Sequence, residues 1–561
     1  MNTDIRARVR AAYARIAEVD RPEVWITLRP EEELLTEAKT LEQRLASGDT
    51  LPLAGSLVAV KDNIDVLGLP TTAGCPAFAY RPEVTATAVA RLVDAGALVL
   101  GKTNLDQFAT GLVGTRSPYG AVRNAHDPSR ISGGSSSGSA VAVALGIADI
   151  GIGTDTAGSG RIPAAFNAIV GIKATLGLVP TTGVVPACRS YDAVTVFAAS
   201  LSLAQTAIAT MTGPDDADPR SRTWPATVRL AASDRPVVAV PRDEDLAPLS
   251  ADARRAFHAV IETLHAAGAD TTTVDVSALL DAATLLYDGT LVAERHAAVG
   301  EFVDAHPDDV DPSVGSIISA AATLAAREHV LDLERLDHYR IAADRALDGC
   351  DALLLPTAPR HPSLAEVAAD PLGVNRQLGT YTNFVNLLDL VAVAVPGGRA
   401  DGGPFGVSVI ARAFDDQVAI DVAALVTGEQ SPVSYPDSGV DLVVFGAHLR
   451  GQPLNSQLAG ARFAGEVRTA PEYRMVLVPG VTDRPGIVHI GTGAALPGER
   501  WVLSPAALGQ FLAALPAPMT LGQILLDDGT TAVGFHCDHV TGQTSSDITE
   551  HGGWRDYLAH Q

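Results

Sequence analysis

The chain is poor in cysteine and in basic side chains. Its 561 residues include four cysteines, Cys75, Cys188, Cys350 and Cys537, which lack the spacing of a metal site. We therefore expect reduced thiols in a cytoplasmic protein rather than a disulfide scaffold. There are 41 Lys and Arg against 65 Asp and Glu, a net charge of −24. Because nucleic acid attracts positive charge, this balance argues against a nucleic-acid partner.

Long hydrophobic runs are also missing. The longest apolar stretch, residues 140–147, is too short to cross a bilayer and is better interpreted as a buried helix. Residues 3–10 are charged and amphipathic, unlike the apolar centre of a signal peptide. We expect no membrane association, no metal and no cofactor.

Hydrophobic residues make up 47% of the chain, enough for a large core. Apolar runs typical of strands buried on both faces alternate with longer segments of helical spacing such as 250–267 and 314–347, which predicts an α/β sheet covered by helices on both sides. The expected strands are residues 57–60, 97–100, 150–153, 236–240, 352–355 and 391–395.

The pattern of apolar segments changes near residue 428. Residues 429–439 have the composition of a linker. The segments that follow are short, separated by Gly and Pro, and more often strand than helix, which predicts a smaller α+β domain over 440–561. Its expected strands are residues 442–445, 473–478, 487–490, 501–503 and 531–537.

The most informative motif is the run of small residues 153–163 around Ser159. A serine hydroxyl needs a nearby base and a place for the negative charge that builds on the substrate oxygen. Glycine and alanine before Ser159 leave backbone N–H groups uncovered, as an oxyanion hole requires. By itself the run is equally typical of a Gly-rich turn after a buried strand.

A second serine motif, residues 133–138, has two other interpretations. It matches the G-x-S-x-G elbow of α/β-hydrolases, with Ser136 as nucleophile, but the polar residues 124–130 before it do not form the strand that the elbow needs. It also lacks the lysine of a phosphate-binding loop.

Three residues in order, Lys61, Ser135 and Ser159, resemble the lysine, serine and serine of the amidase signature family. The resemblance covers about residues 50–425, so that residues 1–428 form an amidase domain with a helical N-terminal segment 1–50 and a central mixed sheet covered by helices. It implies that Ser159 is the nucleophile and that Ser135, on a cis peptide bond, relays a proton to a neutral Lys61. Burial would have to lower the pKa of that lysine. The backbone amides at Thr156, Ala157 and Gly158, with that of Ser159, would form the oxyanion hole.

Within that family, three features resemble allophanate hydrolases: the variant 155–161 with Ala157, the segment 287–295, and a tail with motifs at 444–449, 453–455 and 552–555. The resemblance implies hydrolysis of allophanate to ammonia and carbon dioxide. Arg295 would hold the substrate carboxylate and Tyr287 would donate to its oxygen. Arginine offers planar paired donors that suit a carboxylate. Arg295 could instead form a surface ion pair with Glu294 or Glu301.

Two charged or titratable residues remain to be placed. Arg161 is a rival anion holder, unless it pairs internally with Asp155. In the tail domain, thought to assist decarboxylation of N-carboxycarbamate, His448 is the candidate acid or base. A structural role for His448 is equally open, and His489, His536 and His539 compete with it.

The resemblance also bears on partners. It implies a small anionic amide substrate and a homodimer, and leaves open an association with an upstream urea carboxylase or biuret hydrolase. The alternatives are a general carboxylic-acid amidase or urethanase of the same family, the amidase component of a tRNA-dependent amidotransferase, and a non-catalytic protein that retains the fold.

Overall fold

The computed structural model describes residues 4–561 except 431–434, 437, 479 and 481–482. Its contacts divide the chain into two units, one of Met1–Thr223 and Asp234–Val433 and one of Trp224–Ser233 and Ser434–Gln561. Residues 224–233, which the sequence pattern placed in the first domain, thus belong to the second unit. The predicted linker 429–439 lies partly outside the described residues, and the domain boundaries stay predictions.

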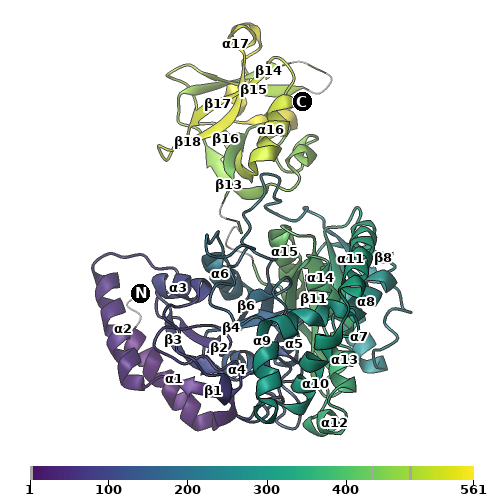
Figure 1. The fold of residues 1–561 in the computed structure, drawn as a ribbon. Helices are drawn as coiled ribbons and strands as arrows, with labels where there is room; N and C mark the ends of the chain where they lie inside the picture. The colour runs from purple at the N-terminus through teal and green to yellow at the C-terminus, as the bar shows by residue number, and fades with distance from the viewer. Residues whose placement is uncertain (1–3, 431–434, 437, 479, 481–482) are drawn as a thin grey trace. The chain divides into compact units, whose positions relative to one another are not determined.

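An eleven-stranded mixed sheet forms the first unit, in the order β1-β3-β2-β4-β6-β5-β10-β11-β9-β7-β8 (Figure 1). The pairs β2–β3, β2–β4, β7–β8 and β7–β9 are parallel and the remaining neighbours are antiparallel. The predicted mixed α/β sheet is confirmed. Its strands are β1 (Trp25–Leu28), β2 (Leu57–Lys61), β3 (Leu98–Thr103), β4 (Ile150–Asp155), β5 (Val170–Lys173), β6 (Ala193–Ala198), β7 (Val237–Pro241), β8 (Asp270–Val274), β9 (Ala352–Pro356), β10 (Val391–Ala400) and β11 (Gly403–Ala411).

Helices cover this sheet, and α1 and α2 pack on each other beside β3. The predicted helix 314–347 is two helices, because residues 321–323 form a 3-10 turn and Leu324 is extended. The α-helices of the unit are α1 (Ile5–Val19), α2 (Glu31–Ala46), α3 (Thr87–Asp94), α4 (Ser137–Ala144), α5 (Ile162–Phe166), α6 (Leu201–Met211), α7 (Ala251–Ala266), α8 (Ser277–Thr284), α9 (Ala293–Ala305), α10 (Pro312–Ala320), α11 (Ala326–Ala346), α12 (Leu364–Ala369), α13 (Gly373–Leu378), α14 (Asn383–Leu387) and α15 (Asp416–Thr427).

The expected buried helix is α4, whose residues are small or apolar on every side, as suits a helix enclosed by protein. It packs against β2 and β4. Glycines in β4 make this approach possible: a Cβ on Gly153 would lie 2.6 Å from Ser136 Oγ. The close packing fixes the serine motif at the start of α4 against the carboxyl end of β4.

The second unit is sheet-rich, with a five-stranded sheet in the order β13-β16-β12-β18-β17 and a two-stranded sheet β14-β15. All five predicted strands of this unit form, while β13 and β17 were not predicted because alternating polar residues leave them only partly buried. The elements are β12 (Val440–Val444), β13 (Arg462–Arg468), β14 (Tyr473–Val478), β15 (Arg484–His489), β16 (Pro497–Leu503), α16 (Pro505–Ala513), β17 (Met519–Leu525), β18 (Thr531–Cys537), α17 (His539–Thr544) and α18 (Trp554–Ala559).

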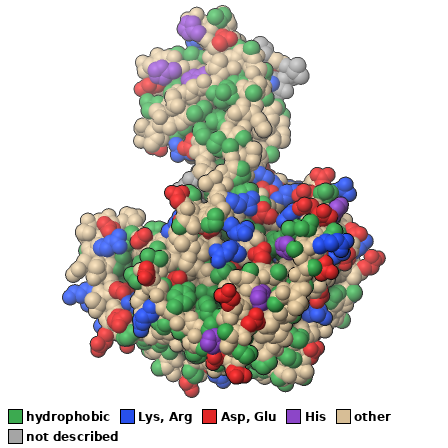
Figure 2. Space-filling view, viewed as in Figure 1, with side chains coloured by type: hydrophobic (Ala, Val, Ile, Leu, Met, Phe, Trp, Pro, Cys, Tyr) green, Lys and Arg blue, Asp and Glu red, His purple; other side chains and the backbone are tan. Residues whose placement is uncertain are grey.

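The surface charges and the cysteine thiols can now be placed on the structure. Figure 2 shows acidic and basic side chains interspersed over the visible face of the first unit. All four cysteines are free thiols and buried. Among the described residues, no helix combines the length and apolarity needed to span a bilayer.

Candidate active site

The candidate site lies where two parallel strands end. β2 ends at Lys61 and its neighbour β4 ends at Asp155. Because the carboxyl ends of parallel strands share one edge of a sheet, side chains that follow them meet there. Lys61 Nζ lies 2.7 Å from Thr154 Oγ1 and 2.8 Å from Ser135 Oγ. The topology thus brings together two of the three residues that the sequence singled out.

Lys61 is completely buried. Burial disfavours the ammonium form and lowers the pKa of Lys61 to about 7, although the carboxylates of Asp106, Asp155 and Asp192 act in the opposite direction. The positive charge of Arg295 adds to the lowering. Near neutral pH a large fraction of Lys61 is therefore the free amine, which can accept a proton.

Ser135 is also buried and lies just before α4. The Gly134–Ser135 peptide is cis, as the resemblance implied. Asp106 organises the backbone around it: its carboxylate accepts N–H groups of Gly114 at 2.9 Å and Arg116 at 2.9 Å, and its own N–H donates to Ser135 O. The sequence analysis did not identify Asp106.

Ser159 lies in the turn between β4 and α5 and is 3% exposed. The turn is held by Asp155, whose carboxylate accepts N–H groups of Gly158 at 2.8 Å and Gly160 at 2.9 Å. Gly158 has φ +125°, and a Cβ there would lie 2.5 Å from Thr382 Oγ1, so only glycine fits. The loop that carries Ser159 is therefore shaped by a buried carboxylate on one side and by Thr382 on the other.

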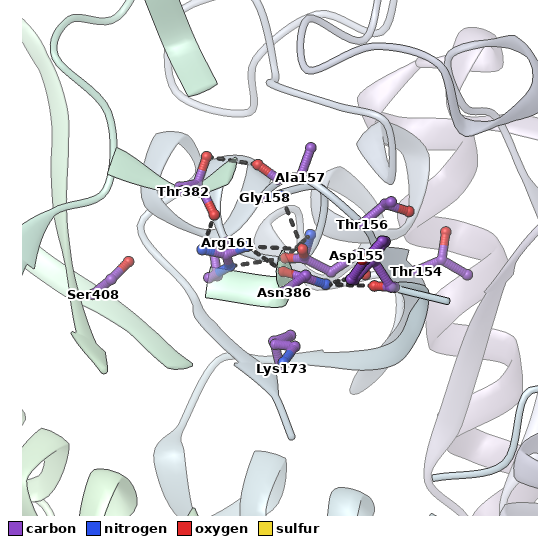
Figure 3. A network of polar contacts seen from close by, with 12 residues as sticks. Thr154, Asp155, Thr156, Ala157, Gly158, Arg161, Lys173, Thr382, Asn386 and Ser408 are labelled. Atoms are coloured by element: carbon purple, nitrogen blue, oxygen red, sulfur yellow. Dashed lines mark hydrogen bonds and ion pairs between the residues drawn. The ribbon is translucent and has the colours of Figure 1, made fainter. Parts of the chain in front are cut away.

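The sequence left open whether Arg161 holds an anion or pairs with Asp155. It is fully buried and forms a two-pronged ion pair with Asp155, with Nε and Nη2 each 2.9 Å from a carboxylate oxygen (Figure 3). Burial raises the pKa of Asp155, but Arg161 outweighs it and holds that pKa below its ordinary value. Arg161 thus pairs internally, and its remaining donors reach Thr382 O and Asn386 Oδ1, each at 3.0 Å.

The network in Figure 3 connects the loop that carries Ser159 to α14. Thr382 Oγ1 donates to Ala157 O at 2.7 Å, and Asn386 Nδ2 donates to Asp155 O at 2.8 Å. Thr156 Oγ1 donates to the carboxylate of Asp192. Nothing in the sequence indicated that Thr382 and Asn386 support the loop that carries Ser159.

The two predicted substrate-binding residues lie together. Arg295, on α9, is 1% exposed, which contradicts a surface ion pair. Its Nη1 donates to Thr110 Oγ1 at 2.9 Å and its Nη2 to Tyr287 Oη at 3.3 Å, while Nε is buried without an acceptor among the described residues. Glu294 is engaged elsewhere, by Ser190 N at 2.8 Å. Arg295 is therefore a buried cation without a carboxylate partner in the described structure.

In the second unit, His448 follows β12 and is 7% exposed. Its ring stacks on Phe535 with centroids 4.9 Å apart, and Nε2 lies 2.9 Å from Gln457 Oε1. Burial lowers the pKa of His448, and the positive charge of Arg484 adds to this effect. Arg484, which the sequence analysis missed, lines the same small cavity and has a buried Nε without an acceptor among the described residues.

The other histidines of this unit differ. His489 is exposed and pairs with Glu472 at 2.9 Å, and His539 lies 2.9 Å from Gln543 Nε2. His536 Nε2 lies 3.4 Å from Gln523 O. His448 lines a small cavity together with Arg484. No group of three or more His, Cys, Asp or Glu in the described part of the chain is arranged to hold a metal ion.

Comparison with known proteins agrees with these features. Residues 7–419 match the Amidase family and residues 440–559 match the allophanate hydrolase C-terminal domain. A selenomethionine-substituted allophanate hydrolase of Kluyveromyces lactis superimposes with a TM-score of 0.86 at 36% identity, over 99% of this chain and 96% of that chain.

Two sequence relatives differ in coverage. A urea amidolyase of Lachancea kluyveri is 40% identical over 95% of this chain, but the chain spans only 31% of that protein. A glutamyl-tRNA(Gln) amidotransferase component of Halobacterium salinarum is 34% identical, over 67% of this chain and 95% of that protein. The full-length match of both units is with the Kluyveromyces enzyme. The chain therefore belongs to the amidase family and, within it, to the allophanate hydrolases.

Proposed function

We propose that Ser159 is the nucleophile, Ser135 the proton relay and Lys61 the base of an amide hydrolase. The 2.8 Å contact between Lys61 Nζ and Ser135 Oγ supports the relay, as does a lysine pKa of about 7. A general base works best when its pKa lies near the working pH. Lys61 then takes a proton through Ser135 while Ser159 attacks the carbonyl carbon.

The oxyanion is stabilised by backbone amides of the same loop, at Thr156, Ala157, Gly158 and Ser159. The Gly158 N–H already donates to Asp155 at 2.8 Å, so the larger share falls to the other three. An N–H group aimed at the developing charge is worth roughly a hundredfold to a thousandfold in rate.

The substrate is allophanate, a urea that carries one carboxylate. The observation that carries this proposal is Arg295, a buried guanidinium whose Nε has no acceptor among the described residues. The substrate carboxylate would satisfy Arg295, and the neighbouring Tyr287 hydroxyl would donate to a substrate oxygen. A buried cation without an anionic partner costs several kcal/mol, which a bound anion offsets.

The proposed reaction has three steps: acylation of Ser159, hydrolysis of the acyl-enzyme and decarboxylation. Ser159 Oγ bonds to the carbamoyl carbon, the bond from that carbon to the terminal nitrogen breaks, and ammonia leaves with the proton returned by the relay. Water then attacks the acyl-enzyme, and N-carboxycarbamate is released. In the second unit, His448 assists loss of carbon dioxide: the C–N electron pair returns to nitrogen, which takes up a proton.

The setting of the enzyme is proposed as well. We expect a cytoplasmic homodimer that receives allophanate from an upstream urea carboxylase or biuret hydrolase activity. This chain spans 31% of the length of the urea amidolyase relative. The domain limits 1–428, 429–439 and 440–561 belong to the same proposal.

The test is ammonium release by the purified protein with allophanate, biuret, simple amides and a urethane as substrates. We expect fast release from allophanate that Ser159→Ala abolishes. Arg295→Gln should raise KM for allophanate at least tenfold, because a charged hydrogen bond is worth about 1.5–3 kcal/mol. Arg255→Gln, which alters an exposed arginine that pairs with Asp252 at 2.7 Å, is the matched control.

Other outcomes decide between the alternatives. Fast release from simple amides or the urethane, unaffected by Arg295→Gln, would retain the serine mechanism and identify a general amidase or urethanase. An unreactive protein that Ser159-directed fluorophosphonate does not label would contradict the enzyme assignment itself.

A further inference from the structure

The first unit contains a cavity of about 410 Å³. Pockets of a few hundred Å³ accommodate small ligands. Its lining comes from residues 176–181, 189–192 and 218–222 together with α11 and α14. Four arginines line it, Arg189, Arg220, Arg222 and Arg340, which is unusual in a chain with 41 basic and 65 acidic residues.

The carboxylates of this cavity are already engaged. Asp218 accepts Thr181 N at 2.7 Å and Thr181 Oγ1 at 3.0 Å. Asp192 accepts Ala187 N at 2.9 Å and the hydroxyl of Thr156. Asp389 pairs with Arg222 at 2.8 Å. Each of these three carboxylates therefore already has a hydrogen-bond or ion-pair partner.

The arginines divide into two groups. Arg222 is held by Asp389, and Arg340 pairs with Asp337 at 2.6 Å. The side chains of Arg189 and Arg220 have no acceptor among the residues that the structure describes. Both side chains are exposed, so two guanidinium groups on the cavity wall face solvent and are free to bind an anion. Paired guanidinium donors match the oxygens of a carboxylate or phosphate.

The cavity wall also contacts the candidate active site. Asp192, in the lining, accepts the hydroxyl of Thr156 from the nucleophile loop. Ser190, also in the lining, donates its N–H to Glu294 at 2.8 Å, next to Arg295. Residues 187–192 therefore connect the arginines of the cavity to the loop that carries Ser159 and to the helix that carries Arg295.

We propose that this cavity is an anion site that binds a small carboxylate or phosphate between Arg189 and Arg220, and that residues 187–192 transmit its occupancy to the nucleophile loop. The bound anion neutralises the two guanidinium groups and draws them together. The segment that contains Arg189 then shifts the Asp192 carboxylate against Thr156.

The experiment titrates inorganic phosphate, and separately malonate, into the intact protein by calorimetry at constant ionic strength. In the Arg295→Gln background, which removes the carboxylate-binding cation of the substrate site, adding Arg189→Gln and Arg220→Gln together should weaken binding at least tenfold, and adding either one alone should weaken it by less. Arg255→Gln should bind as the unaltered protein does. Arg295→Gln should also retain binding, which distinguishes this cavity from the substrate site. A stronger response to phosphate or to malonate identifies the class of anion.

Coupling is measured as the rate at which a neutral fluorophosphonate labels Ser159, with and without saturating anion. We expect a change of at least twofold in the unaltered protein and none when Arg189 and Arg220 are both replaced. These measurements do not require allophanate, so failure of the proposed substrate would not affect them. Binding that persists in the Arg295→Gln background after both Arg189 and Arg220 are replaced, or that Arg295→Gln alone abolishes, would refute the site. Binding without an effect on labelling would refute the coupling.

Discussion

The pKa of Lys61 predicts how the reactivity of Ser159 depends on pH. Lys61 can act as a base only when it is neutral. Burial lowers its pKa to about 7, from the ordinary value of 10.5. A group is neutral above its pKa when its charged form is the protonated one, so reactivity should rise with pH and level off above about 8.

The magnitude follows from the neutral fraction. With a pKa near 7, about nine tenths of Lys61 is neutral at pH 8 and about one tenth at pH 6, so the rate should fall roughly tenfold between them. With an ordinary lysine pKa, the neutral fraction at pH 7 would be lower by roughly a thousandfold. Burial therefore accounts for most of the available base at neutral pH.

The assay is the second-order rate of Ser159 labelling by a neutral fluorophosphonate between pH 5.5 and 9.5. A neutral probe keeps substrate ionisation out of the profile. Lys61→Met removes the base but keeps an apolar side chain of similar length. It should leave a slow rate that no longer falls between pH 8 and pH 6, the acid limb of the profile. Arg295→Gln should shift the limb toward higher pH, because Arg295 contributes to the lowering of the Lys61 pKa.

Two results would refute the reasoning. A labelling rate that stays constant down to pH 5.5 would mean that Lys61 is not the base. A limb that appears only near pH 10 would mean that burial does not keep the amine neutral. In either case the relay through Ser135 would need another proton acceptor.

Three further substitutions test the remaining features. Asp155→Asn leaves the fully buried Arg161 without its carboxylate and should lower the free energy of unfolding by about 3–5 kcal/mol in urea titrations; a loss below 1 kcal/mol would mean that the backbone contacts suffice. Gly158→Ala should slow labelling of Ser159 at least a hundredfold, because a Cβ would lie 2.5 Å from Thr382 Oγ1; Gly315→Ala, whose Cβ would have no neighbour closer than 3.8 Å, is the control. His448→Ala should leave ammonium release from the first step intact and slow release of carbon dioxide, followed by mass spectrometry, whereas a uniform loss of both would indicate a structural histidine.

Much of the fold was predictable because its strands are buried on both faces. Continuous apolar runs such as those of β2, β4 and β10 stand out from the surrounding chain. The strands β1, β8, β13 and β17 were missed because they are only partly buried, and β8 consists largely of threonines. Burial alone did not suffice, since β5, β6 and β11 are buried along their whole length and were also missed. The break between α10 and α11 was missed because an alanine-rich segment continues across it in the sequence.

The sequence by itself determined which residues are the candidates for the chemistry of the site. Lys61, Ser135 and Ser159 lie in local motifs whose residue types are needed close to the reacting groups. Arg295 was singled out in the same way, although its burial was not predictable. Local sequence is informative here because turns of Gly, Ala and Ser are shaped by their own backbone.

Only the tertiary structure decided which groups support that chemistry. Hydrogen bonds that join residues 155–161 to Thr382 and Asn386 connect positions more than 200 residues apart in the chain. The lowered pKa of Lys61 likewise depends on burial by the whole fold, and the arginine cavity is assembled from separate stretches of chain. Such contacts and desolvation arise from packing, which no local pattern of residues specifies.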